Sequence, residues 1–222
     1  MGRTGCPQAR GRLNAAEVHA RELARVAALS PAPGRIAVHR WYLRHDAPWE
    51  IGRPTPRDGL ALVRAHGPTV AFYRFLYDEV GHDWLWGDMR RATDEAIAAR
   101  LAEPGNRLHY LSVDGTPAGM VEVRLNGEGG DGESELAYVG LMPGRTGAGL
   151  GRWMLATAIA DTLDERCEPL TINTCTTDSA GGLALYTSLG FAIVDEVDFE
   201  EGDPRAEGLI APHVRPEVPM AR

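Results

Sequence analysis

The stretch YVGLMPGRTGAGLGRWML, residues 138–155, decides how the rest of the sequence is interpreted. An apolar run ends at Pro143, and four glycines then precede a segment with helical periodicity. A helix N-terminus carries unpaired backbone N–H groups and the positive end of the helix dipole, and glycines let the backbone approach a phosphate closely. The stretch therefore predicts a phosphate-binding turn between a strand and a helix. A turn with a purely structural role remains the alternative at this point.

Other phosphate-binding loops fit this stretch poorly. A Walker loop ends in Gly-Lys-Ser/Thr, whereas the tripeptide here is Gly151-Arg152-Trp153. A dinucleotide-binding loop needs G-x-G-x-x-G with an acidic residue closing the next strand, and the strands expected before this loop are joined by hairpins. Binding of a nucleoside triphosphate therefore stays only a weak alternative.

The remaining sequence predicts one mixed α/β domain. Asp114-Gly115 is a strong hairpin signal between two of its strands. The expected elements are a helix at 14–30, strands at 36–43 and 60–65, helices at 68–80 and 91–103, hairpin strands within 107–125, a strand at 134–142, the helix after the glycines, a strand at 169–175, a helix at 179–190 and a strand at 191–200. This order is not the repeated βαβ of a doubly wound fold. We expect an N-terminal extension over 1–35 that is disordered over 1–13, a catalytic domain over 36–202 with an added N-terminal strand, and an irregular tail over 203–222.

Composition excludes several classes of function. The chain has 222 residues, 44% of them hydrophobic and 24% charged, which is enough to bury a full core. Its net charge of −8 argues against general binding to nucleic acid, and would suit a site for a cationic small molecule. No apolar segment suggests a membrane span or a signal peptide. Cys6, Cys167 and Cys175 lack the spacing of a disulfide framework or a metal site, so we expect a cytoplasmic protein without a metal.

Two segments together carry a resemblance to a known family. VGLMPGRTGAGLGRWML (139–155) and ALYTSLGF (184–191), at this spacing and in this strand order, resemble the GNAT superfamily of GCN5-related N-acetyltransferases. The resemblance covers about residues 59–200, and GHDWLW (81–86) resembles a bacterial subgroup. It implies a mixed, mostly antiparallel sheet flanked by helices. An extra N-terminal helix and strand would precede this core, either extending the sheet or serving a homodimer contact.

The resemblance also implies the reaction: acetyl-CoA would donate its acetyl group to a primary amine of a small molecule, or to an exposed amino group, by direct attack in a ternary complex. Cys175 is not expected to act as a nucleophile, because no histidine is placed beside it. An acyl-CoA-binding sensor that has lost turnover is the alternative.

The family's pyrophosphate loop, Q/R-x-x-G-x-G/A, is only partly matched. Aligning its glycines with Gly149 and Gly151 puts Thr146 where Gln or Arg is usual, and Arg152 could compensate by reaching a phosphate. This departure is what makes a sensor conceivable. The pantetheine arm would pair with the strand near Leu141 and Met142, where a backbone N–H would polarise the thioester carbonyl. The residues implied at the coenzyme are Leu141, Met142, Arg145, Thr146, Gly147, Ala148, Gly149, Leu150, Gly151, Arg152, Ser179 and Tyr186.

Three residues are candidates for proton transfer. Tyr186 occupies the family's usual tyrosine and resembles the general acid that protonates the departing thiolate, or else a packed aromatic. Glu135 stands where the family often carries a carboxylate, and Glu122 is a second candidate base. If the hairpin loop is 127–130, Glu122 and Glu135 face each other, which would raise one pKa. Solvated charges on a hairpin are the alternative.

The acceptor site is expected beneath an aromatic segment. FYRFLYDEVGHDWLW (72–86) contains six aromatic residues, of which Tyr73, Trp84 and Trp86 are the candidate contacts. Asp83 and Asp88 nearby would suit an amine with an apolar body. Tyr73 fits equally well on the core face of its helix.

Overall fold

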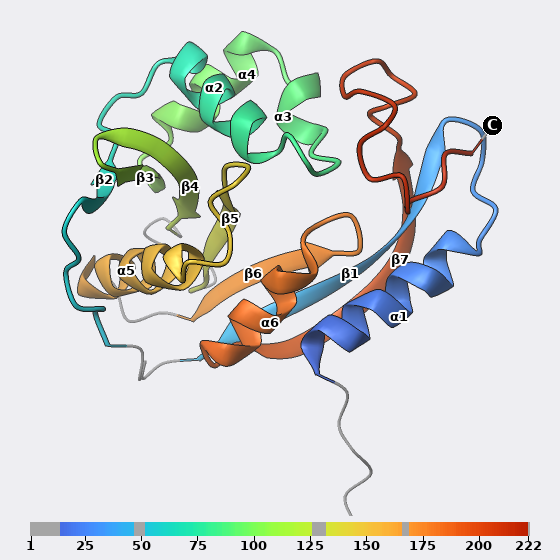
Figure 1. Ribbon diagram of the computed structural model, residues 1–222. Helices are drawn as coiled ribbons and strands as arrows, with labels where there is room; N and C mark the ends of the chain where they lie inside the picture. Colours follow the sequence, from blue (N-terminus) through green and yellow to red (C-terminus); the bar gives the residue numbers. More distant parts are fainter. Residues whose placement is uncertain (1–13, 47–51, 126–131, 166–168, 222) are drawn as a thin grey trace, which may run out of the picture.

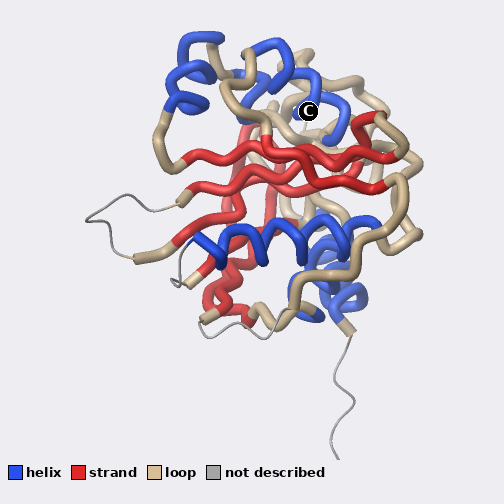
Figure 2. The backbone as a smooth tube through the Cα atoms, turned by 90° about the vertical axis from the view of Figure 1, so that its left-hand side faces the viewer, coloured by secondary structure: helices blue, strands red, loops and turns tan. Residues whose placement is uncertain are grey.

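The computed structural model describes residues 14–46, 52–125, 132–165 and 169–221. The elements are α1 (Ala15–Ala27), β1 (Arg35–His45), β2 (Leu60–Arg64), α2 (Val70–Val80), α3 (Asp88–Arg91), α4 (Asp94–Ala102), β3 (Asn106–Val113), β4 (Thr116–Arg124), β5 (Ser134–Leu141), α5 (Leu150–Glu165), β6 (Leu170–Cys175), α6 (Ala180–Ser188) and β7 (Ala192–Gly202). One sheet lies between two helical layers: α2, α3 and α4 cover one face, and α1, α5 and α6 the other (Figure 1, Figure 2). This arrangement confirms the predicted fold class.

The seven strands lie in the order β2-β3-β4-β5-β6-β1-β7. Every neighbouring pair is antiparallel except β5 and β6, which are parallel. The added N-terminal strand, β1, therefore does not extend the sheet at an edge. It lies between β6 and β7, with Arg40 opposite Cys175 on one side and Val197 on the other. Because both edges of β1 are paired within the chain, its backbone is not available for a dimer contact.

Local signals at several element ends act as the sequence predicts. Asn14 caps α1, and its side chain and that of Glu17 bond each other's backbone N–H in a capping box. Asp114 and Gly115 have φ values of 49° and 82°, the two positive values that a type I′ hairpin turn requires. Gly190 follows α6 with φ of 94°, in the left-handed conformation that commonly ends a helix.

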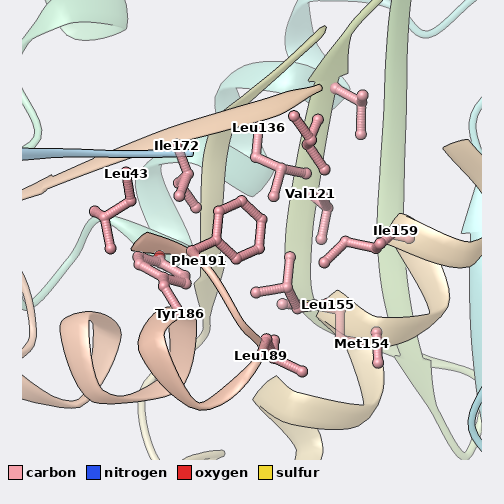
Figure 3. Close-up of a cluster of buried hydrophobic side chains, with 14 of the residues drawn as sticks. Leu43, Val121, Leu136, Met154, Leu155, Ile159, Ile172, Tyr186, Leu189 and Phe191 are labelled. Atoms are coloured by element: carbon pink, nitrogen blue, oxygen red, sulfur yellow. The ribbon is translucent and has the colours of Figure 1, made fainter. Parts of the chain in front are cut away.

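The main core packs α5 and α6 against the sheet (Figure 3). The helical spacing of the apolar residues predicts one stripe on α5, made of Met154, Leu155, Ala158, Ile159 and Leu163. In the structure every residue from 154 to 160 is buried. The difference arises because more than the sheet contacts this helix: the Trp153 indole donates a hydrogen bond to the Thr55 carbonyl at 3.0 Å, so the segment before β2 also packs on it. Leu163, which belongs to the predicted stripe, lies outside the side chains that the structure describes.

The opposite face carries two smaller cores. One joins α2 and α4 to β3 and β4. The other joins β1 to Leu85 and to Val214 and Val218 of the C-terminal segment. That segment, 203–221, contains no helix or strand but packs beside α3 (Figure 1), to which a salt bridge of 2.7 Å between Glu207 and Arg91 joins it. A buried salt bridge of 2.9 Å between Asp203 and Arg205 lies within the segment itself.

No helix in the described ranges combines the length and apolarity needed to cross a bilayer. Three sequence predictions fall outside the described residues: the disorder of 1–13, the hairpin loop 127–130, and everything concerning Cys6 and Cys167. The division into 1–35, 36–202 and 203–222 stays a prediction.

Candidate active site

The parallel strands β5 and β6 diverge soon after they begin. Ser134, Glu135 and Leu136 pair with residues 170–172, and the two strands then diverge. A cavity of about 440 Å³ occupies this gap. It is lined from below by the glycine loop and the starts of α5 and α6, and from above by the α2–α3 connection, α3, and the upper faces of β1 and β7. The gap therefore connects the two faces of the sheet.

The glycine loop presents backbone amides to this cavity. Gly147 and Gly149 have φ values of 87° and 71°, and a Cβ on either would meet no atom within 4 Å. These glycines are therefore required by conformation and not by crowding. Helical hydrogen bonding begins with the Trp153 N–H donating to the Gly149 carbonyl at 3.1 Å, which leaves the amides of Leu150, Gly151 and Arg152 without an intrahelical acceptor.

Most residues expected at the coenzyme lie around the cavity, and three do not. Met142, Arg145 and Ala148 are not among its lining residues. Those that line it are Leu141, Thr146, Gly147, Gly149, Leu150, Gly151, Arg152, Ser179 and Tyr186. Arg152 also donates to the Ser188 hydroxyl at 2.8 Å, which holds its guanidinium near the entrance between α5 and α6. Ser179 caps α6 by accepting from the Gly181 N–H at 3.2 Å.

The backbone of β5 is oriented by its pairing with β4. The Met142 N–H donates to the Ala118 carbonyl at 2.9 Å, so it faces β4 and not the gap. Because successive N–H groups of a strand point in opposite directions, those of Val139 and Leu141 point toward β6, which pairs with β5 only as far as Leu136. Donors for an extended ligand are therefore the N–H groups of Val139 and Leu141. Leu141 is one of the two residues expected there, whereas Met142, the other, faces β4.

Tyr186 lies on α6 with its ring at the boundary between core and cavity. It packs against Phe191 in the main core and is 7% exposed (Figure 3). Burial raises the pKa of its hydroxyl above the usual value, and the nearby Asp178 and Cys175 raise it further. The hydroxyl therefore stays protonated at neutral pH and is able to donate a proton.

Neither predicted base lines the cavity. Glu122 is fully buried, accepting hydrogen bonds from the Tyr73 hydroxyl at 2.8 Å and from Arg100 Nε at 2.6 Å. Glu135 is partly exposed, 3.8 Å from Arg124, at the end where β5 and β6 are still paired. The prediction that the two carboxylates face each other is wrong: Glu122 lies opposite Tyr138 and Glu135 opposite Arg124. The observed register pairs Glu135 with Arg124, two residues after Glu122, and a bulge between Glu122 and Val123 shifts the pairing further.

Two of the three candidate acceptor contacts lie at the cavity. Trp84 and Trp86 line the cavity, whereas Tyr73 is fully buried in the α2 core. Trp86 donates its indole N–H to Asp178 at 3.0 Å, and the Arg215 guanidinium lies 5.0 Å from the Trp84 ring. The two indoles are thus fixed by the β6–α6 loop and by the C-terminal segment.

The sequence did not predict several residues of the upper wall, the part of the cavity lining on the side of α3, β1 and β7. Arg40, Arg91 and Glu201 all line the cavity, together with Cys175. Glu201 follows a strongly acidic run, VDEVDFE (194–200), which by itself is typical of a solvated strand. No local signal distinguishes it, because it reaches the site only through the pairing of β7 with the inserted β1.

Within the described residues, no group of three or more His, Cys, Asp or Glu side chains is arranged to hold a metal ion. Burial raises the pKa of the Cys175 thiol well above its usual value, with Asp178 adding to this, so little of the reactive thiolate forms.

Comparisons with solved structures show the same fold. A protein described as a GNAT-family acetyltransferase from Novosphingobium aromaticivorans aligns at 18% identity and TM-score 0.51, over 77% of this chain and 67% of its own. A GCN5-related N-acetyltransferase from Kribbella flavida gives 17% and 0.52 over 77% and 60%, and one from Sphaerobacter thermophilus gives 14% and 0.54 over 75% and 52%. The chain thus spans between half and two thirds of these proteins' length.

Among curated proteins the sequence has no significant match. The model of the acetyltransferase (GNAT) family matches residues 71–191, which is more than half of the chain and includes the glycine loop, α5, β6 and α6. The chain belongs to the acetyltransferase (GNAT) family.

Proposed function

We propose that the protein is an N-acetyltransferase that moves an acetyl group from acetyl-CoA to a primary amine of a small molecule or to an exposed amino group. The observation that carries this proposal is the cavity that crosses the sheet at the β5–β6 gap. It joins free amides at the start of α5 on one face to an aromatic wall on the other. Two reactants entering from opposite faces would meet in the gap, which favours direct transfer in a ternary complex.

The start of α5 fits the diphosphate of coenzyme A. The amides of Leu150, Gly151 and Arg152 have no intrahelical acceptor, the helix dipole is positive there, and Arg152 adds a cation at the entrance. Thr146 stands where the family usually has Gln or Arg, which removes a side-chain contact but leaves the backbone amides in place.

The open edge of β5 fits an extended pantetheine arm, which would pair with it as an added strand. The N–H groups of Val139 and Leu141 point into the gap, and either would donate to the thioester carbonyl oxygen. Such a donor stabilises the negative charge that develops on this oxygen as the amine attacks.

Tyr186 supplies the proton that the departing thiolate needs. Its raised pKa keeps the hydroxyl protonated, and its side chain lines the cavity. Acetyl-CoA supplies the activated thioester, so no covalent intermediate on the protein is required, in agreement with the suppressed ionisation of Cys175.

The upper wall suits a cationic acceptor. Trp84 and Trp86 offer aromatic faces, and Asp88, Asp178 and Glu201 offer negative charge in the same cavity. The net charge of −8 would further attract an ammonium ion.

Two measurements on the purified protein test the proposal. Calorimetry with acetyl-CoA is expected to show binding at one site per chain, tighter than the binding of ATP. Thiol release from acetyl-CoA is then followed across phenethylamine, tryptamine, spermidine and N-α-acetyl-lysine, and at least one of these amines is expected to accelerate it. Binding without accelerated release would instead indicate a coenzyme-binding sensor, and tighter binding of ATP would contradict the coenzyme assignment.

A further inference from the structure

The reaction needs a group that removes a proton from the acceptor's ammonium ion, and three carboxylates line the cavity: Asp88, Asp178 and Glu201. Asp178 is engaged by the protein itself. Its Oδ1 accepts from the Trp86 indole at 3.0 Å, and its Oδ2 accepts from the Cys175 N–H at 2.9 Å and lies 3.2 Å from the Thr174 hydroxyl. This carboxylate therefore holds the β6–α6 loop and Trp86 in place.

Asp88 is the first residue of α3, and its side chain is largely exposed. It lies 3.7 Å from Arg91, close enough for a weak ion pair within the helix. A carboxylate that is exposed to water and already close to a cation holds an incoming ammonium ion only weakly. Asp88 is thus poorly placed to bind the acceptor.

Glu201 differs from both. It lies on β7 opposite Ile36, and the antiparallel register puts it on the same face of the sheet as Phe199 and Arg40. Its side chain is partly buried, and among the described residues its carboxylate has no hydrogen bond or salt bridge. Of the three acidic groups in the cavity, Glu201 is the one whose carboxylate is both sheltered from water and unengaged.

Neither cation facing Glu201 is bonded to it, and the buried Nε of Arg40 has no hydrogen-bond partner among the described residues. Arg91 donates to both oxygens of Glu207, at 2.7 and 3.0 Å, and to the Gly202 carbonyl. The Arg40 guanidinium lies 4.5 Å from the centre of the Phe199 ring, in a cation–π contact. The protein therefore surrounds this carboxylate with charges but leaves its direct partner to be supplied by a ligand.

The electrostatic surroundings agree with this geometry. Burial is the largest cause that raises the pKa of Glu201; Arg40 and Arg91 oppose it, Asp88 and Asp178 reinforce it, and the net pKa is about 7. Cys175, the other titratable group that β6 turns toward this wall, stays neutral. A carboxylate with this pKa exchanges protons readily at neutral pH, as an efficient general base must.

We propose that Glu201 is the catalytic base: it binds the acceptor's ammonium group and takes its proton before the nitrogen attacks. The inference rests on the proposed acetyl transfer. One ammonium proton passes to Glu201 and then to solvent. The nitrogen forms its bond to the acetyl carbon as the carbon–sulfur bond breaks, and Tyr186 gives its proton to the sulfur. The second proton that the nitrogen loses returns to the Tyr186 oxygen, so the hydroxyl is restored.

The first test compares E201Q with E200Q. Glu200 is the adjacent residue on β7, exposed and paired with Arg35, so it controls for the loss of one negative charge from this strand. Thiol release from acetyl-CoA is measured across pH with the best amine of the panel named above. In the wild type, kcat/KM should rise with pH, and the slope of this rise should decrease near pH 7, where Glu201 loses its proton. The ionisation of the amine itself adds its own change of slope to the profile.

E201Q should lower kcat/KM by about 100-fold or more and lose the change of slope near pH 7. Its affinity for acetyl-CoA should stay within a factor of two of the wild type, and E200Q should behave as the wild type. A variant E201Q that retains the rate or the change of slope near pH 7 would overturn the inference while leaving the proposed function intact. Failure of the wild type to bind acetyl-CoA would overturn the proposed function, and with it the base.

A second measurement does not depend on turnover. The carboxyl carbon of Glu201 is followed by NMR in ¹³C-glutamate-labelled protein, assigned by its absence in E201Q, with and without phenethylamine. The signal should titrate near pH 7 in the free protein and at lower pH when the ammonium ion is bound. A signal that titrates near pH 4.5, or that no amine of the panel moves, would show that Glu201 neither holds a proton nor meets the acceptor.

Discussion

Replacing Arg100 by methionine would remove the only cation in direct contact with the buried carboxylate of Glu122 among the described residues. Glu122 is 0% exposed, and its partners are Arg100 at 2.6 Å and the Tyr73 hydroxyl at 2.8 Å. After the change, one neutral donor would remain for a charge that water does not reach. Breaking a buried ion pair from one side costs about 3–5 kcal/mol. Set against a typical domain stability of about 5–15 kcal/mol, this is a large loss.

The loss is measured on the folded protein itself. Urea denaturation followed by circular dichroism gives the free energy of unfolding of R100M and of the wild type under the same conditions. The difference between the two values is the cost of leaving the Glu122 carboxylate without its cation.

Two further variants make the test specific. R124M removes a partly exposed arginine that pairs with Glu103 at 3.1 Å, and should cost less than about 1 kcal/mol. The double variant R100M/E122Q removes the uncompensated charge and should recover much of the stability lost in R100M. If R100M costs no more than R124M, Glu122 is not the buried, paired carboxylate described here.

Three other predictions concern the site. Gly149→Ala forces a side chain into φ of 71° at a cost of about 1–2 kcal/mol and should weaken acetyl-CoA binding in calorimetry; Gly144→Ala, at φ of 75° but outside the cavity, should leave that affinity unchanged. Tyr186→Phe should lower kcat by about 100-fold without changing the Kd of acetyl-CoA, whereas Tyr110→Phe, which lies outside the cavity, should leave both unchanged; an equal kcat for the two variants would remove Tyr186 as the acid. Glu201 has its folded pKa raised from 4.5 to about 7, so the wild type should lose about 3 kcal/mol of stability between pH 4.5 and pH 8 that E201Q does not lose; parallel unfolding curves for the two proteins across pH would contradict the raised pKa.

Short-range signals were sufficient for much of the fold. Asn14 with Glu17, Asp114 with Gly115, and Gly190 each fix the backbone within a few residues, so their effects follow from sequence alone. The glycine loop is similar: the positive φ values of Gly147 and Gly149 are local requirements, and the sequence places them before the correct helix.

Long-range pairing explains what the sequence did not predict. A strand's pattern does not say which neighbours it will have, so the position of β1 between β6 and β7, and with it the approach of Glu201 and Arg40 to the cavity, could not be derived. The opposition of Glu122 and Glu135 depended on the centre of one hairpin and on the absence of a bulge. Because side chains alternate between the two faces of a strand, a small error in register is enough to separate two residues.

A structure of the protein with acetyl-CoA bound tests the central claim most directly. The account predicts that the diphosphate oxygens accept hydrogen bonds from the amides of Leu150, Gly151 and Arg152, and that the thioester lies in the β5–β6 gap near Tyr186. A coenzyme bound elsewhere, with those amides facing solvent or protein, would contradict it.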